Sequence, residues 1–207
     1  PTFSAYERFF MGWLTPRVMC EKEKVALLEL QTSNTALLIC ETDEHNLVGN
    51  NPNPTTFYLL ENRQRVGWDT YLPGHGLMLT KVQYNSKKWT ENTVNNVASK
   101  MGVDLIEADG DANEIYAKET DLFPAGATEY KGIENHWIEN IVEADSIIYF
   151  YYKSDETGIE NHVKIEECVM AIYNILGQKL STTEIDMLPR GTYVVLTSMG
   201  VNKIIRR

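Results

Sequence analysis

Residues 57–85 read FYLLENRQRVGWDTYLPGHGLMLTKVQYN, and they contain two apolar runs separated by a polar segment. The apolar runs are rich in aromatic and aliphatic side chains, as β-strands are, while proline and glycine punctuate the segment between them. The pattern predicts a long β-hairpin with a polar tip.

Short apolar runs of the same kind recur along much of the chain, separated by Asn, Asp, Gly and Pro. The predicted strands are residues 25–30, 35–40, 56–60, 76–82, 103–108 and 147–152. Six such runs over about 130 residues predict a β-sandwich.

Two segments have helical spacing instead. In residues 3–14 the aromatic side chains recur at the spacing of one helix face; these are Phe3, Tyr6, Phe9, Phe10 and Trp13. Thr2 or Ser4 can cap the start of this helix, and Pro16 ends it. Residues 89–101 form a second, short candidate helix.

Composition limits the classes of function. The chain has 207 residues, 43% of them hydrophobic, which is enough for one substantial core or two small ones. The net charge of −10 comes from interspersed acidic and basic residues, a pattern that argues against nucleic acid as a partner. No apolar run approaches the roughly 20 residues of a transmembrane helix.

The first half of the chain resembles a known family. The motifs are SAYER and GWLTP in residues 4–16, and YLLENRQ, GWD and LPGHGL in residues 58–77. They are similar to the region that follows the catalytic domain in immune-inhibitor-A-type secreted zinc metallopeptidases. This resemblance implies that residues 1–16 close a peptidase domain, that zinc is held in that domain, and that the parent enzyme acts on protein substrates. Family members carry a histidine and an aspartate ahead of the tyrosine equivalent to Tyr84, and this chain has neither there.

The chain lacks the zinc-binding sequence of such an enzyme. That sequence is HExxH, in which two histidines one helical turn apart face one metal. The four histidines are scattered: His45, His75, His136 and His162. We therefore expect the chain to be the C-terminal portion of a longer precursor, inactive by itself, with the catalytic half upstream.

Four residues of the predicted hairpin are candidates for a domain interface. Glu61, Arg63 and Asp69 carry complementary charges, since the guanidinium of arginine can bind a carboxylate in bidentate fashion. They either orient the sandwich against the peptidase domain or hold the hairpin tip in shape. Trp68 is predicted to anchor a core or an interface. His75 is predicted to be a turn residue whose ring is hydrogen-bonded locally.

A possible cation site lies in the segment ADGDANE, residues 108–114. Asp109, Asp111 and Asn113 alternate as in the first half of a calcium loop. Thr120 stands where an EF-hand would place its closing glutamate. The alternative is an Asx-rich turn between strands.

Three cysteines, Cys20, Cys40 and Cys168, form no CxxC pair and no even disulfide framework. Cys20 and Cys40 can bridge if their strands are neighbours. The prediction we adopt is that they are buried free thiols.

The C-terminal quarter carries a second resemblance. VMAIYNILGQK (169–179), LPRGTYVVL (188–196) and the closing KIIRR (203–207) predict two turns between short strands. These motifs look like the C-terminal sorting domain of the type IX secretion system of Bacteroidota. The residues that carry this resemblance are Gly177, Gln178, Pro189, Gly191, Tyr193 and Lys203. It implies export through the periplasm to the cell surface or the medium, with the type IX machinery as a partner; a small β-unit that packs on the main sandwich is the alternative.

Together these observations predict a mainly β chain with three parts: an N-terminal helix (1–16), a β-sandwich (17–153), and a linker with a small β-sandwich-like module (154–207). The implied function is the non-catalytic C-terminal region of a secreted zinc endopeptidase. The competing hypothesis is a cell-surface binding module for glycan or host protein. It expects four aromatic side chains to be exposed in one patch: Trp68, Tyr71, Tyr84 and Trp89.

Overall fold

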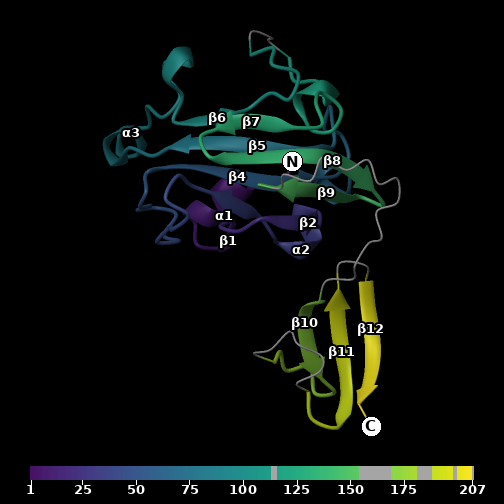
Figure 1. Ribbon diagram of the computed structural model, residues 1–207. Coiled ribbons are helices and arrows are strands. Elements are labelled where there is room, and N and C mark those ends of the chain that lie inside the picture. The colour runs from purple at the N-terminus through teal and green to yellow at the C-terminus, as the bar shows by residue number, and fades with distance from the viewer. Residues whose placement is uncertain (113–115, 154–168, 181–187, 198–199, 207) are drawn as a thin grey trace. The chain divides into compact units, whose positions relative to one another are not determined.

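The chain is mainly β, as its sequence predicts (Figure 1). The structure is a computed structural model that describes residues 1–112, 116–153, 169–180, 188–197 and 200–206. It divides into two compact units, Pro1–Asp155 and Glu156–Arg207.

The first unit contains a five-stranded sheet built around the predicted hairpin. Its strands, in spatial order, are β1 (Arg17–Val18), β3 (Leu37–Ile39), β4 (Thr56–Arg63), β5 (Gly76–Gln83) and β6 (Val103–Leu105). The central pair, β4 and β5, is antiparallel, with its register running from Thr56 opposite Gln83 to Arg63 opposite Gly76. The predicted hairpin is thereby confirmed.

A second sheet of four strands faces the first. Its order is β2 (Glu23–Leu27), β9 (Ile147–Tyr152), β8 (His136–Ala144) and β7 (Tyr130–Ile133). Apolar side chains from both sheets share one core, which gives the unit its sandwich-like layers. This core includes Val25, Leu27, Leu37, Ile39, Leu60, Leu79, Ile138, Ile148 and Phe150.

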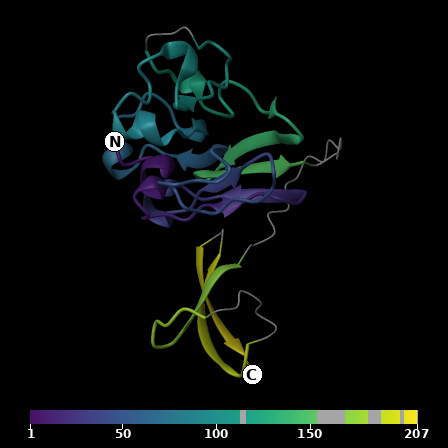
Figure 2. The same ribbon diagram turned by 90° about the vertical axis from the view of Figure 1, so that its left-hand side faces the viewer.

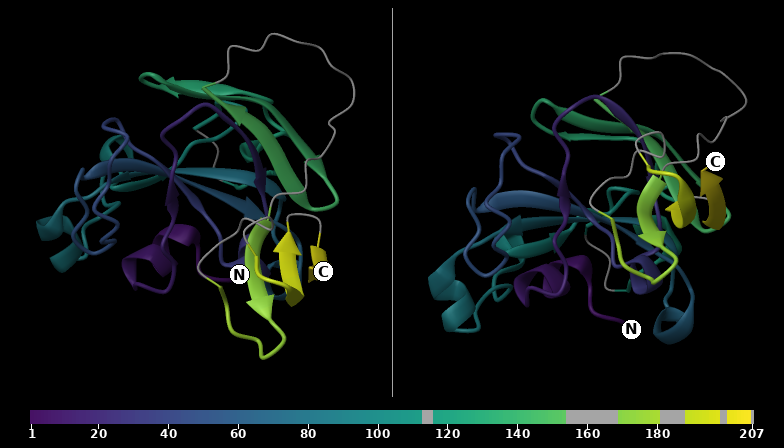
Figure 3. Two further views of the ribbon diagram at one scale, coloured as in Figure 1. Left: turned by 60° about the horizontal axis from the view of Figure 1, so that its bottom comes forward. Right: turned by 90° about the horizontal axis from the view of Figure 1, so that it is seen from below.

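The five-stranded sheet is covered on its other face as well. Helix α1 (Ala5–Phe10) lies against that face, on the side opposite the four-stranded sheet (Figure 3). A second core forms there from Ala5, Phe9, Leu14, Ala36, Leu38, Cys40, Phe57, Leu59 and Val82. A sheet buried on both faces explains why β3 reads as a continuous apolar run instead of alternating.

Helix α1 is shorter than predicted but starts where the sequence indicates. Ser4 caps it, and Ser4 and Glu7 form a reciprocal capping box. The loop before β4 packs tightly on this helix, because a Cβ at Gly49 would lie 2.2 Å from the carbonyl oxygen of Phe9. Only glycine permits that approach.

Most of the remaining helical segments are single turns. They are α2 (Leu30–Ser33), α3 (Ser86–Thr90), η1 (Gly67–Asp69), η2 (Ala98–Lys100) and η3 (Glu119–Asp121). The teal segments that follow β5 gather at one edge of the sandwich (Figure 2). The predicted helix over residues 89–101 is wrong: α3 ends at Thr90, and Asn92 adopts a left-handed conformation (φ 53°) that interrupts any continuation.

Strands β7 and β8 were not predicted. The alternation of β8 is broken by a register shift between Glu139 and Val142, within which Asn140 has φ 53°. A bulge of this kind moves the buried positions out of phase and conceals the two-residue period.

The second unit contains a three-stranded antiparallel sheet in the order β10 (Val169–Asn174), β11 (Gly191–Thr197) and β12 (Gly200–Arg206). Its small core consists of Ile172, Leu188, Tyr193 and Val195, with Leu180 packed against them. The strands lie where the sequence predicts them, and the described residues form one sheet.

Candidate functional site

The polar sequence Glu61-Asn62-Arg63-Gln64 is buried, and most of it belongs to strand β4 instead of the hairpin tip. The expectation of a polar tip was therefore wrong at these positions. Successive side chains of a strand point to opposite faces, so these residues face the two cores in turn. Asn62 donates to the carbonyl oxygens of Leu27 and Ser146, at 2.8 Å each, and so links β4 to the opposite sheet. Gln64 donates to Asn62.

On the helix-facing side, Arg63 lies between two carboxylates. Its Nε is 2.5 Å from Oε1 of Glu61, and its Nη1 is 2.8 Å from Oδ2 of Asp69. All three side chains are less than a tenth exposed. The structure thus brings Glu61, Arg63 and Asp69 into one buried cluster, hereafter the Arg63 cluster.

The Arg63 cluster holds the N-terminal segment in place. The backbone N–H and hydroxyl of Thr2 donate to Asp69 at 2.6 and 2.8 Å. Arg63 donates to the Thr2 hydroxyl oxygen at 3.0 Å. The backbone N–H of Ala5, the first residue of α1, donates to Glu61. A carboxylate at this position also interacts favourably with the N-terminal end of the helix dipole.

Burial and pairing act on the pKa values of the cluster in different directions. Burial raises the pKa of Glu61, although the charge of Arg63 and the Ala5 N–H oppose this effect. For Asp69, burial would also raise the pKa, but hydrogen bonds from Thr2 and Arg63 outweigh it, and the pKa is lowered. Arg63 remains protonated, because its two carboxylate partners outweigh the effect of burial on its pKa.

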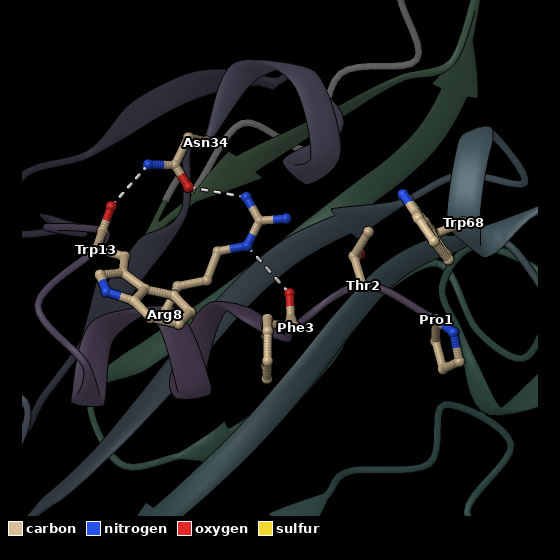
Figure 4. A pocket seen from close by; sticks show the side chains of 7 residues that line it. All are labelled: Pro1, Thr2, Phe3, Arg8, Trp13, Asn34 and Trp68. Atoms are coloured by element: carbon tan, nitrogen blue, oxygen red, sulfur yellow. Dashed lines mark hydrogen bonds between the residues drawn. The ribbon is translucent and has the colours of Figure 1, made fainter.

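A pocket of about 460 Å³ adjoins this cluster, and Figure 4 shows the side chains that line it. They are Pro1, Thr2, Phe3, Arg8, Trp13, Asn34 and Trp68. Phe3 and Trp13 pack edge to face with ring centroids 5.4 Å apart. The polar members are fixed from within: Arg8 donates to the carbonyl oxygen of Phe3 and to Asn34, whose amide donates to the carbonyl oxygen of Trp13. The result is an open pocket lined by aromatic side chains, with polar members that are hydrogen-bonded to the pocket's own backbone and to one another.

Trp68 does not anchor the core. Its side chain is 81% exposed, because η1 places it on the surface while the neighbouring Asp69 points inward. The four aromatic residues that were expected to lie in one patch are divided. Tyr71 is exposed, whereas Tyr84 and Trp89 are half-buried against the second core, with ring centroids 4.9 Å apart.

His75 connects distant segments, so the prediction of local hydrogen bonding was wrong. Its Nδ1 lies 3.0 Å from a carboxylate oxygen of Glu143 on β8, and its Nε2 lies 3.5 Å from Glu119. The glycines on either side of His75 indicate a turn. The contact with Glu143 could not be predicted in the same way, because it depends on how β8 packs against the rest of the unit.

The predicted calcium residues lie in an exposed turn. The carboxylate of Asp109 accepts hydrogen bonds from the backbone N–H of Asp111 at 3.0 Å and from the Thr120 hydroxyl at 2.6 Å. Asn113 lies outside the described residues. In the described ranges, no group of three or more His, Cys, Asp and Glu side chains is placed to hold a metal ion. These contacts favour the Asx-turn interpretation.

A thermal melt tests the two interpretations of this loop. Because internal hydrogen bonds already occupy both carboxylate oxygens of Asp109, we expect the same Tm in calcium and in EDTA. A bound cation would instead stabilise the folded state by mass action. A rise in Tm with calcium that disappears in Asp109→Asn would establish Asp109 as a ligand and contradict this expectation.

The sorting-like motifs form turns and strands in the second unit. Gly177 has φ 78° in a turn where the Asn174 side chain accepts from the backbone N–H groups of Leu176 and Gln178. The hydroxyl of Tyr193 donates to the Pro189 carbonyl oxygen at 3.1 Å. Of the other two residues that carry the sorting resemblance, Gly191 is the first residue of β11, and the backbone of Lys203 in β12 pairs with Val194 of β11.

Sequence reasoning missed the partners from the N-terminal segment. Thr2 and the Ala5 N–H lie more than 50 residues before Asp69 and Glu61, the hairpin residues to which they donate. Arg8 lines the adjoining pocket. The aromatic helix face was the available signal for Phe3 and Trp13.

Comparisons with protein-family models, with curated proteins and with solved structures found no match for this chain. None of the helices in the described part of the chain has the length and apolar character needed to cross a membrane.

Proposed function

We propose that the first unit is a non-catalytic supporting domain of a secreted zinc-dependent endopeptidase, and that the second unit directs export through type IX secretion. The observation that carries the first proposal is the buried Arg63 cluster, which fixes the N-terminal segment so that Phe3, Trp13 and Trp68 remain exposed beside it. The motif resemblances supply the enzyme class and the export route.

Exposed aromatic side chains on a hydrogen-bonded base suit contact with another protein domain. Clustered apolar surface marks interaction sites, and tryptophan is enriched among the residues that dominate binding energy. Here the backbone beneath the aromatic groups is fixed by Thr2, Arg8 and Asn34, so little ordering is required on contact. A peptidase domain adjoining the N-terminal segment is the partner that the resemblance implies.

Among the described residues, no group of three or more His, Cys, Asp and Glu side chains is placed to hold a metal ion, and the sequence contains no HExxH. We propose that the catalytic steps take place in a separate domain. Bound in a separate catalytic domain, the metal would polarise the peptide carbonyl and activate water.

The alternative function, a surface binding module, is supported by Trp68 of the pocket together with the exposed Tyr71 outside it. Trp68 and Tyr71 are both exposed on the segment between β4 and β5, and stacking on such rings is one way to hold a sugar. Because Tyr84 and Trp89 contribute to a core instead, the patch is smaller than this hypothesis expects.

Binding measurements with single variants distinguish the two functions. If the coding region upstream of Pro1 encodes an HExxH domain, we expect that domain, made separately, to bind this chain. Trp13→Ala and Trp68→Ala should each weaken binding about tenfold or more, as expected of interface anchors. Tyr116→Ala, which alters another exposed aromatic residue outside the pocket, is the matched control.

An upstream region without such a helix, or binding that is insensitive to both tryptophan variants, would contradict the supporting role. Glycan binding that depends on Trp68 would establish the alternative.

A further inference from the structure

Two of the three cysteines follow neighbouring strands in matching register. Strands β1 and β3 are parallel, with Arg17 opposite Leu37 and Val18 opposite Leu38. The pairing continues beyond β1, because the backbone N–H of Met19 donates to the Leu38 carbonyl oxygen at 2.8 Å. Extending the register by two residues places Cys20 opposite Cys40.

The thiols of these cysteines point to the same short loop. Cys20 Sγ donates to the carbonyl oxygen of Asp43 at 3.1 Å, and Cys40 Sγ donates to that of Glu44 at 3.2 Å. These acceptors belong to consecutive residues. Neighbouring strands lie about 4.8 Å apart, within the range of roughly 4.4–6.8 Å between Cα atoms that a disulfide requires. Both cysteines are free thiols in the structure, and Cys40 is buried as predicted, whereas Cys20 is exposed, so the prediction of a buried thiol was wrong at that position.

We propose that Cys20 and Cys40 form an oxidation site, which closes to an intrachain disulfide by exchange with a small-molecule disulfide such as oxidised glutathione. The inference rests on strand register and thiol contacts, and it is independent of the proposed function. The bridge would close the chain between β1 and β3 and so fasten an edge strand of only two residues to the sheet.

The exposures of the two cysteines set the order of the steps. Cys20 is exposed and Cys40 is buried, so the oxidant reaches Cys20 first. The Cys20 thiolate attacks one sulfur of oxidised glutathione, breaking its S–S bond and releasing one glutathione as a thiol. Cys40, after losing its proton, attacks Cys20 Sγ and displaces the second glutathione. The protein loses two electrons and two protons, and the oxidant becomes two thiols.

The local environment favours a lasting structural bridge over a fast sensor. Desolvation raises the pKa of both thiols, through burial at Cys40 and through partial shielding from water at the exposed Cys20, and the Asp43 carboxylate raises the pKa of each further. Little thiolate is then present at neutral pH, which makes exchange slow in both directions.

Mass spectrometry of the full chain tests the proposal. After equilibration with oxidised and reduced glutathione, we expect wild type and Cys168→Ser to contain a tryptic peptide pair in which residues 18–22 are linked to residues 25–63. In intact Cys168→Ser, the mass should fall by that of two hydrogen atoms. The bridge should raise Tm by about 5 °C or more, and Cys20→Ser, which alters an exposed side chain, should lack this rise.

Three results would each overturn the proposal. The first is that Cys20 and Cys40 both stay alkylatable in the folded, oxidised protein. The second is that glutathione persists on Cys20 without release. The third is a wild-type linkage that joins Cys168 to one of them in place of the predicted pair.

Discussion

Replacing Arg63 with methionine should lower the stability of the chain by about 3–5 kcal/mol, the effect of removing one partner from a buried ion pair. The substitution leaves Glu61 and Asp69 buried without their cation and removes a donor to Thr2. In a unit of this size, the loss corresponds to a fall in Tm of roughly 6–20 °C. Differential scanning calorimetry of wild type and variant gives the measurement.

Arg65→Met is the matched control, because it removes the same side chain two residues away. Arg65 is 40% exposed, pairs with Glu119 at 3.5 Å and donates to the carbonyl oxygens of Leu72 and Pro73. An exposed pair of this kind contributes under about 1 kcal/mol.

A double variant shows whether the loss comes from the pair. Glu61→Gln combined with Arg63→Met should be less destabilising than the sum of the two single changes, because one of the two carboxylates left without a cation is then neutral. Equal effects of Arg63→Met and Arg65→Met would show that the buried pairs of Arg63 contribute no more than an exposed pair. Strict additivity of the two cluster changes would show that Glu61 and Arg63 are not energetically coupled.

The sequence predicts the elements that depend on local pattern. The β4–β5 hairpin has strong strand formers on both sides of a glycine-containing segment, and the structure confirms it. The start of α1 is similarly local, because Ser4 and Glu7 lie three residues apart and cap one helix end. Strand β8 fails the same analysis, since its bulge at Asn140 shifts the side-chain period in mid-strand.

The candidate site was predictable only in its charges. Glu61, Arg63 and Asp69 are complementary in type and close in sequence, which is why they could be grouped. Their burial was not visible, because a run of four polar residues normally indicates solvent. It is tolerated here because the buried groups find hydrogen-bond partners from distant segments, including Thr2 and Leu27. Those partners depend on the packing of α1 and on the docking of the second sheet, which are long-range properties.

Helix α1 poses a related question, because the resemblance assigns residues 1–16 to the closure of a peptidase domain, while the structure packs the helix into the sandwich unit. The burial of Phe9 indicates how strongly α1 is attached to the sandwich. Phe9 is 2% exposed and lies edge to face against Phe57 at 6.0 Å and close to the His45 ring at 5.8 Å.

Phe9→Ala should therefore lower the free energy of unfolding of this chain by about 3–5 kcal/mol, the usual range for emptying a buried phenylalanine site. Chemical denaturation with urea measures the change. Phe3→Ala is the control within the same segment; Phe3 is 56% exposed, so its truncation should change stability by less than about 1 kcal/mol. A small effect of Phe9→Ala would mean that α1 detaches readily and belongs energetically to another domain. A large effect for Phe9 alone would mean that α1 stabilises the sandwich through its buried face. The exposed Phe3 and Trp13 would then be available to a partner domain, so that one short segment contacts both the sandwich and that partner.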